Sequence, residues 1–232
     1  MHTGTGQVLE LILEEERHYV RVSCPANLIP SPGQYLLASD DSYAPLPVPL
    51  FYTDSAPQGG SMAPWRHFVA AAPETAPWSP GLVLHLRGPL GRGFSLPLVA
   101  RRVGLVAFED SPARLRGLIG QALRQDAAVV LVGNSAPDTL PDDVEVQPLS
   151  ALSEILEWAD YAAFDIAREN LHQLMEGMGK RKKFSAAMAA QVLVSTPVPC
   201  GGIAECGVCA VTLRSEWKLA CKDGPVFDWG DI

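Results

Sequence analysis

The sequence predicts two folded domains followed by a short tail: an antiparallel β-barrel, a parallel-sheet α/β domain and a small cysteine-rich tail. Three observations lead to this division. Six short apolar segments separated by Pro and Gly come first; long apolar segments then alternate with segments of helical period; and four of the five cysteines fall near the end. We place the boundaries at residues 1–98, 99–196 and 197–232. The 232 residues, 47% of them hydrophobic, can form sizeable cores and exclude a disordered chain.

The first domain is expected to consist of strands alone. Pro25, Pro30, Pro32 and Gly33 exclude a helix between its early segments and favour turns. The alternating or β-branched segments predict strands at 7–13, 19–24, 34–39, 50–53, 67–71 and 81–87. Six short strands without an intervening helix indicate a small antiparallel barrel or sandwich.

The second domain shows the β-α-β pattern. Continuous apolar segments predict strands at 103–108, 127–133, 144–149, 161–166 and 191–196. Apolar residues three and four positions apart predict helices at 113–124, 151–158 and 168–178. Such a succession forms a parallel sheet covered by helices on both faces. In the tail, 217–220 is expected to form a short strand and 223–225 a turn.

Charge and hydropathy exclude several kinds of partner. The net charge of −8 repels phosphate backbones, so nucleic acid is not expected to bind. No apolar segment approaches the ~20 residues of a membrane-spanning helix. The first residues are acidic where a signal peptide is basic, and we therefore expect a cytoplasmic protein.

Cys200, Cys206, Cys209 and Cys221 are the predicted metal ligands. They follow the spacing C-x5-C-x2-C-x11-C, in which three thiolates share one tight loop and a fourth arrives from a neighbouring strand. This arrangement is typical of a [2Fe–2S] cluster, and the intervening glycines allow backbone N–H groups to face its sulfides. Zinc and free thiols are the alternatives, although zinc ribbons usually have two C-x2-C pairs and this chain has one. Disulfides are disfavoured in a reducing cytosol, and Cys24 is expected to be a core thiol.

Three groups of motifs occur in order along the chain. They are SPGQY at 31–35, GPLGRGF at 88–94, and CGGIAECGVC at 200–209 with CKDGPVF at 221–227. Together they resemble the electron-transfer subunit of class 1B dihydroorotate dehydrogenase. The resemblance implies a fold like ferredoxin–NADP reductase with FAD on the barrel and NAD in the α/β domain. It also implies a hetero-oligomer with a flavin-containing catalytic subunit of pyrimidine biosynthesis.

The chain departs from this family at its cofactor sites. The family has four residues between the first two cysteines, and this chain has five. The family's flavin strand reads Arg-Pro-x-Ser-x, whereas 48–52 reads VPLFY and lacks both the cation and the hydroxyl. FAD binding is therefore left open, and the sequence assigns no individual flavin contact.

The nucleotide loops also differ. After the first parallel strand the chain has Glu109 and Asp110 where a glycine-rich turn is expected, and Asp110 or Ser111 is the expected helix cap. Asp165-Ile166-Ala167 replaces the family's Cys-Gly-Pro loop. Because carboxylates repel a pyrophosphate, we expect no NAD binding.

The expected function is electron transfer between the cluster and the flavin of a partner dehydrogenase, most plausibly the dihydroorotate-oxidising subunit. No catalytic residue is assigned, because the chain is not expected to make or break substrate bonds. The residues of the tail, such as Val226 and Phe227, are expected to border the partner. A non-redox scaffold or regulatory subunit with a structural metal is the alternative.

Overall fold

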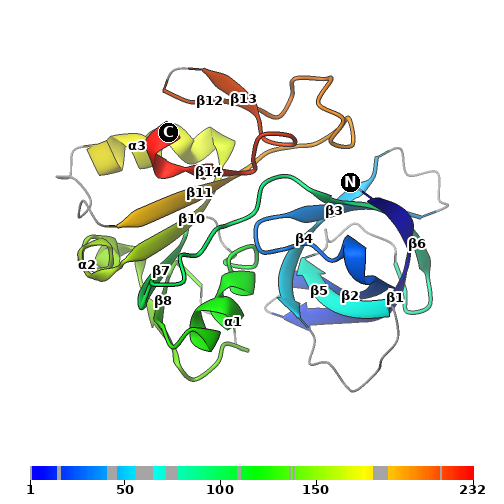
Figure 1. Ribbon diagram of the computed structural model, residues 1–232, viewed down its shortest axis with the longest axis horizontal. Coiled ribbons are helices and arrows are strands. Elements are labelled where there is room, and N and C mark those ends of the chain that lie inside the picture. The colour runs from blue at the N-terminus through cyan, green and yellow to red at the C-terminus, as the bar shows by residue number, and fades with distance from the viewer. Residues whose placement is uncertain are drawn as a thin grey trace.

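A computed structural model describes residues 2–14, 17–40, 46–55, 65–71, 78–108, 111–135, 137, 139–179, 188–214 and 216–232. The first domain is a closed antiparallel barrel with strand order β1-β2-β5-β4-β3-β6, so the barrel alternative is confirmed (Figure 1). Its strands are β1 (His2–Glu14), β2 (Arg17–Pro25), β3 (Tyr35–Ser39), β4 (Val48–Ser55), β5 (Trp65–Ala71) and β6 (Val83–Leu90). Alternate residues point inward, and Val20, Val22, Leu36, Leu50 and Phe68 fill the interior.

The second domain is a six-stranded sheet of order β14-β11-β10-β7-β8-β9. Its strands are β7 (Arg102–Ala107), β8 (Ala128–Val132), β9 (Val144–Gln147), β10 (Tyr161–Ala167), β11 (Ala189–Ser195) and β14 (Val226–Asp228). Its helices are α1 (Arg116–Arg124), α2 (Leu152–Trp158) and α3 (Leu171–Gly179). The five predicted strands pair in parallel, and α1 packs on one face while α2 and α3 pack on the other.

The end of the chain returns to this sheet. Strand β14 pairs antiparallel with β11, opposite Leu193 to Gln191. Val226 and Phe227 are buried in the cores on the two faces of the sheet, so the expectation that they border a partner is wrong. The short hairpin of β12 (Ala210–Thr212) and β13 (Trp217–Leu219) packs over α3, as Figure 1 shows at the top of the molecule.

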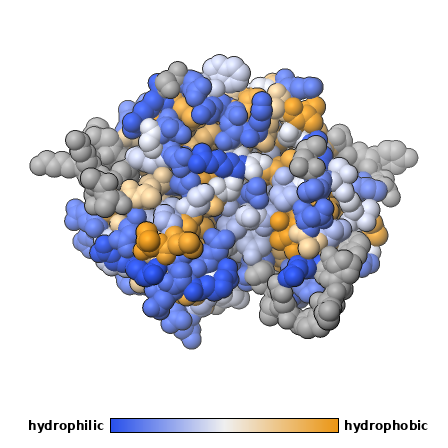
Figure 2. Space-filling view, in the orientation of Figure 1, coloured by the Kyte–Doolittle hydropathy of each residue, from blue (hydrophilic) through white to orange (hydrophobic). Residues whose placement is uncertain are grey.

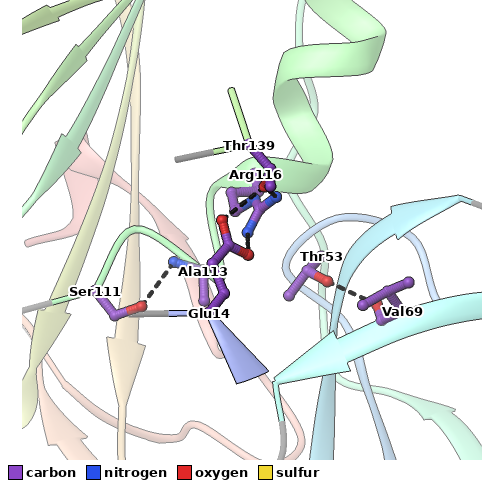
Figure 3. Close-up of polar contacts among 7 residues, drawn as sticks. All are labelled: Glu14, Thr53, Val69, Ser111, Ala113, Arg116 and Thr139. Atoms are coloured by element: carbon purple, nitrogen blue, oxygen red, sulfur yellow. Dashed lines mark hydrogen bonds and ion pairs between the residues drawn. The ribbon is translucent and has the colours of Figure 1, made fainter. Parts of the chain in front are cut away.

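The barrel and the α/β domain touch through α1. A Cβ added to Gly117 would lie 2.6 Å from Cδ1 of Tyr52 on β4, so only a glycine allows this close approach. Arg116 donates hydrogen bonds to Glu14 at the end of β1 and to Thr139, and Thr139 also donates to Glu14 (Figure 3). The described residues include no helix long and apolar enough to cross a membrane.

Candidate metal centre

The motif groups that carry the family resemblance meet in space where the barrel, the sheet and the tail join. A Cβ on Gly33, which has φ +85°, would lie 2.7 Å from Val226. A Cβ on Gly91 would lie 2.6 Å from Pro225. Arg92 donates its backbone N–H to Gly224 and forms an ion pair of 2.7 Å with Asp228. The barrel therefore contacts residues 224–228, which follow the last of the four cysteines in the chain.

The hairpin explains how Cys209 and Cys221 come together. Ala210 lies opposite Leu219, so the residues that flank the hairpin also face each other. The backbone N–H of Ala220 donates to the carbonyl of Cys209 at 3.0 Å. The hairpin formed by the eleven intervening residues thus brings the two thiols side by side, and both are buried.

The loop before the hairpin surrounds Cys200 with hydrogen-bond donors. Gly201, Gly202 and Gly207 have φ of +63°, +72° and +71°, a region in which glycine is favoured. Burial opposes ionisation of Cys200. Hydrogen bonds from the Cys206 side chain and from the backbone N–H groups of residues 203, 205 and 206 nevertheless lower its pKa to about 6. The loop is built to stabilise a thiolate, which is the form that binds a metal.

The other cysteines occupy different environments. Burial, together with the neighbouring Cys209 and Cys200 thiols, raises the pKa of Cys221 to about 12. Cys206 is exposed at the edge of the loop. Cys24 lies in the barrel interior, where burial raises its pKa to about 12, in agreement with a core thiol.

The four tail thiols form two contacting pairs. Cys200 contacts Cys206, and Cys209 contacts Cys221, with Cys200 also within electrostatic reach of Cys221. In the described part of the chain, no group of three or more His, Cys, Asp or Glu side chains is gathered so as to hold a single metal ion. Two pairs of thiols match the two thiolates that each iron of a two-iron cluster takes.

Arg168, in the short 3-10 turn just before α3, fixes the cysteine loop to the α/β domain. Its guanidinium donates to the carbonyls of Val208 and Ala210, on either side of Cys209. The sequence did not indicate this role, because Arg168 lies 40 residues before its first partner and follows no motif. Only the folded chain brings the two together.

Residues 200–232 match the sequence family described as the iron–sulfur cluster binding domain of dihydroorotate dehydrogenase B. The tail is thus similar to the iron–sulfur domain of this family. The prediction of an iron–sulfur cofactor, made from the spacing of the cysteines, is thereby confirmed, and so is the family resemblance.

Solved structures resemble the whole chain in fold. An NADH-dependent reduced ferredoxin–NADP oxidoreductase, described for flavin-based electron bifurcation, matches with a TM-score of 0.72 and 15% identity over 99% of this chain and 90% of that one. A ferredoxin reductase of carbazole 1,9a-dioxygenase matches with a TM-score of 0.56 and 16% identity, over 78% of this chain and 65% of that one. Ferredoxin–NADP+ reductase from Plasmodium falciparum matches with a TM-score of 0.54 and 8% identity, over 78% of this chain and 91% of that one. The chain ahead of the iron–sulfur domain thus has the ferredoxin reductase-like fold that the resemblance implied.

Strand β4, which corresponds to the family's flavin strand, is half-buried, and its residues Phe51 and Tyr52 pack against other parts of the protein. The ring of Phe51 packs against Tyr35 at 5.3 Å, and the guanidinium of Arg114 lies 5.8 Å from the Phe51 ring centre. Tyr52 is held beneath Gly117 of α1. These residues do not fit a flavin ring stacked on this strand, because their side chains fill the contact between β4 and α1.

An ion pair occupies the carboxyl edge of the parallel sheet, where dinucleotides bind in folds of this kind. Arg114 contacts both oxygens of the fully buried Asp165, at 3.0 and 2.9 Å, and donates to Ser195 at 3.1 Å. The sequence analysis noted Asp165 but missed its partner Arg114. Glu109 and Asp110 lie outside the described residues, so the repulsion expected from them remains a prediction.

The start of α1 differs from the expectation. The helix begins at Arg116, and the preceding Leu115 makes no side-chain cap. Ser111 accepts the N–H of Ala113 at 3.2 Å and thus stabilises the turn ahead of the helix (Figure 3). The N–H groups of Leu115 and Leu118 donate three positions back, to Pro112 and Leu115, so this turn is tighter than an α-helix and the regular helix starts only at Arg116.

Proposed function

We propose that this protein is the iron–sulfur electron-transfer subunit of a dihydroorotate dehydrogenase complex, with Cys200, Cys206, Cys209 and Cys221 as the ligands of a [2Fe–2S] cluster. Bound there, the cluster would supply one-electron chemistry. Oxidation of dihydroorotate in the partner subunit would leave two electrons on the partner's flavin. These would leave one at a time through the cluster to a one-electron acceptor.

The observation that supports this proposal most directly is the arrangement of the thiols within the matched domain. Cys200 and Cys206 form one contacting pair, on a loop whose backbone N–H groups face the sulfur of Cys200. Cys209 and Cys221 form the second pair, at the two ends of the hairpin. Such donors favour sulfur that carries negative charge, as both thiolates and bridging sulfides do. The chain needs no flavin of its own for this role, in agreement with the contacts that Phe51 and Tyr52 of β4 make with Arg114 and Gly117.

The experiment is anaerobic purification followed by measurement of iron, acid-labile sulfide, zinc and flavin on one sample. We expect two irons and two sulfides per chain and a red-brown protein with visible absorption. A colourless protein with one zinc per chain would contradict the proposal and would favour the structural-metal alternative.

The partner is expected to dock where the cysteine loop reaches the surface. Cys206 is exposed, and beside it Ile203 and Val208 are 50% and 41% exposed. Figure 2 shows hydrophobic residues at the surface at the upper right, where the tail lies in Figure 1. Apolar side chains around a redox centre suit close docking of another protein, because electron transfer requires short distances and the apolar rim gains by leaving water.

Negative charge at Ile203 or Val208, the exposed apolar residues of this rim, should weaken docking of the partner while the cluster stays in place. Ile203→Glu and Val208→Glu should lower electron transfer from the purified dihydroorotate-oxidising partner at least tenfold, with unchanged iron content. Val83→Glu is a matched control, since Val83 is 52% exposed on the barrel strand β6. Equal rates for the rim variants and the control would exclude this surface as the docking site.

A further inference from the structure

Tyr35 lies at the point where the barrel meets the cysteine loop. It begins β3, is 1% exposed, and packs with Leu37 and Leu90 in a small apolar cluster on the outside of the barrel. A Cβ added to Gly202 in the cysteine loop would lie 3.4 Å from the Tyr35 hydroxyl oxygen. The hydroxyl therefore faces the loop rather than the barrel interior.

The hydroxyl has no hydrogen-bond partner among the described residues. A buried hydroxyl without a partner costs ~1–3 kcal/mol, so such groups usually have a partner when the protein is in its working form. Burial, followed by the thiols of Cys221, Cys209 and Cys200, raises the pKa of Tyr35 well above its usual range. The hydroxyl thus keeps its proton at neutral pH and lies within electrostatic reach of three of the four thiols.

A second barrel residue adds positive charge on the same side of the loop. The Nη2 atom of Arg87, on β6, lies 3.2 Å from the position that a Cβ on Gly201 would take. Arg87 opposes the pKa increase of Tyr35, so its charge also reaches the hydroxyl. The barrel consequently presents one proton donor and one cation to a centre made of thiolates.

We propose that the Tyr35 hydroxyl donates a hydrogen bond to a sulfur atom of the iron–sulfur centre and thereby raises its reduction potential. Tyr35 does not bind iron. It acts on the centre only through this hydrogen bond to sulfur and is therefore a positioning residue. A one-electron reduction adds negative charge to the sulfur atoms, and a donor therefore stabilises the reduced form more than the oxidised form. This inference rests on the proposed function, because it requires the cluster to be held by the four cysteines.

The test compares wild-type protein with Tyr35→Phe, both purified with their clusters. Removing only the hydroxyl should leave iron and sulfide content unchanged and lower the midpoint potential. We expect the reduction equilibrium to change roughly tenfold, equivalent to 59 mV for one electron. Site-specific 3-fluorotyrosine at position 35 should move the potential in the opposite direction, because its hydroxyl is a stronger donor.

Tyr161→Phe is the matched control. Tyr161 is also fully buried, but its hydroxyl donates to Gln191 at 2.9 Å, and no cysteine contributes to its raised pKa. Its removal should leave the potential unchanged. Resonance Raman spectra provide a second readout: Fe–S stretching bands should shift on transfer to D2O less in Tyr35→Phe than in the wild type.

Each outcome decides one of the two proposals. A wild-type chain without iron and sulfide overturns the proposed function. A loaded Tyr35→Phe variant with wild-type potential and D2O shifts overturns the role of Tyr35 and leaves the proposed function intact. If Tyr35→Phe does not retain its cluster, the fluorotyrosine protein decides, and an unchanged or lowered potential there rejects the hydrogen bond.

Discussion

Gly202 and Gly207 share a backbone conformation but differ in what surrounds them. Both have φ near +70°. An added Cβ would meet Leu90 at 3.3 Å and the Tyr35 hydroxyl at 3.4 Å at position 202, and nothing within 4 Å at position 207. The left-handed conformation costs an alanine ~1–2 kcal/mol at either site. Only at position 202 does crowding against the barrel add to that cost.

Gly202→Ala should therefore disturb the cysteine loop more than Gly207→Ala does. We expect both variants to lower the midpoint of thermal unfolding. Gly202→Ala should also lower iron content, because the loop must move away from β3. The iron content and the midpoint of thermal unfolding, measured on both variants, check this. Gly230→Ala is the control, because Gly230 has no positive φ and an added Cβ would meet no atom within 4 Å. Identical behaviour at 202 and 207 would show that the contact with Tyr35 and Leu90 is unimportant.

Replacing a ligand thiol should remove the cluster. Cys209→Ser and Cys206→Ser should lose most iron and sulfide and the visible absorption, because serine oxygen is a poor ligand for iron in such clusters. Cys24→Ser is the control, since Cys24 is buried in the barrel interior, away from the loop. Full iron and sulfide content in the Cys209→Ser protein would disprove the ligand assignment.

At the scale of elements, the ion pair between β1 and α1 should make stability depend on pH. Burial raises the pKa of Glu14, but hydrogen bonds from Thr139 and Arg116 outweigh it and hold the pKa below its ordinary value of 4.5. A carboxyl group whose pKa is lowered by folding contributes stability above its unfolded pKa. That contribution is lost as the pH falls through the folded value.

Glu14→Gln should therefore be less stable than the wild type at pH 7, by roughly 1.5–3 kcal/mol for the lost charged hydrogen bonds. The difference should shrink steadily below pH 4.5 as the wild-type carboxylate is protonated. Urea unfolding of both proteins from pH 7 to pH 3 measures it. Glu10→Gln is the control, because Glu10 on the same strand pairs with Arg21 at the surface, where ion pairs contribute ~0–1 kcal/mol. A difference that stays constant with pH would contradict the role of Glu14.

The elements themselves could largely be predicted from the sequence, and the exceptions have physical causes. Period-two and period-3.6 patterns marked the barrel strands and the three helices, since each buries one face. Strand β14 has only three residues, too few for a period to be visible, and its place depends on β11. The α1 start was predicted too early because the Ser111 and Pro112 signal stabilises a turn before the helix.

The candidate site could be predicted only where the residues form a local motif. The cysteines share one motif and could be found by spacing. The partners of Tyr35, Arg114 and Arg168 lie 40 to 186 positions away in the sequence, and these residue types are common on any surface or strand. Three-dimensional packing alone identifies them.

At the scale of the whole molecule, the contact between α1 and β4 should prevent flavin binding. The resemblance leaves FAD possible, but Val48 offers no cation and Phe51 no hydroxyl, and both Phe51 and Tyr52 are engaged with α1 or the turn before it. A lost charged hydrogen bond to phosphate weakens binding roughly tenfold to a hundredfold.

We therefore expect little or no FAD in the purified chain and no flavin fluorescence after denaturation. Phe51→Ser with Val48→Arg restores the family residues on the strand and should increase FAD binding measured by calorimetry. Val48→Gln with Phe51→Ser serves as the uncharged control. Stoichiometric FAD in the wild-type chain would show that other residues bind the flavin.

The return of β14 to the sheet determines how the iron–sulfur domain is attached. Strands β11 and β14 are neighbours, so the chain from residue 196 to 225 leaves the α/β sheet and re-enters it at adjacent strands. The cysteines thus sit on a loop closed at both ends by backbone hydrogen bonds, and a closed loop has far fewer open conformations than a free chain end. The pairing of β11 with β14 therefore limits the conformations that the four cysteines can take, and this lowers the entropy cost of gathering them around one cluster.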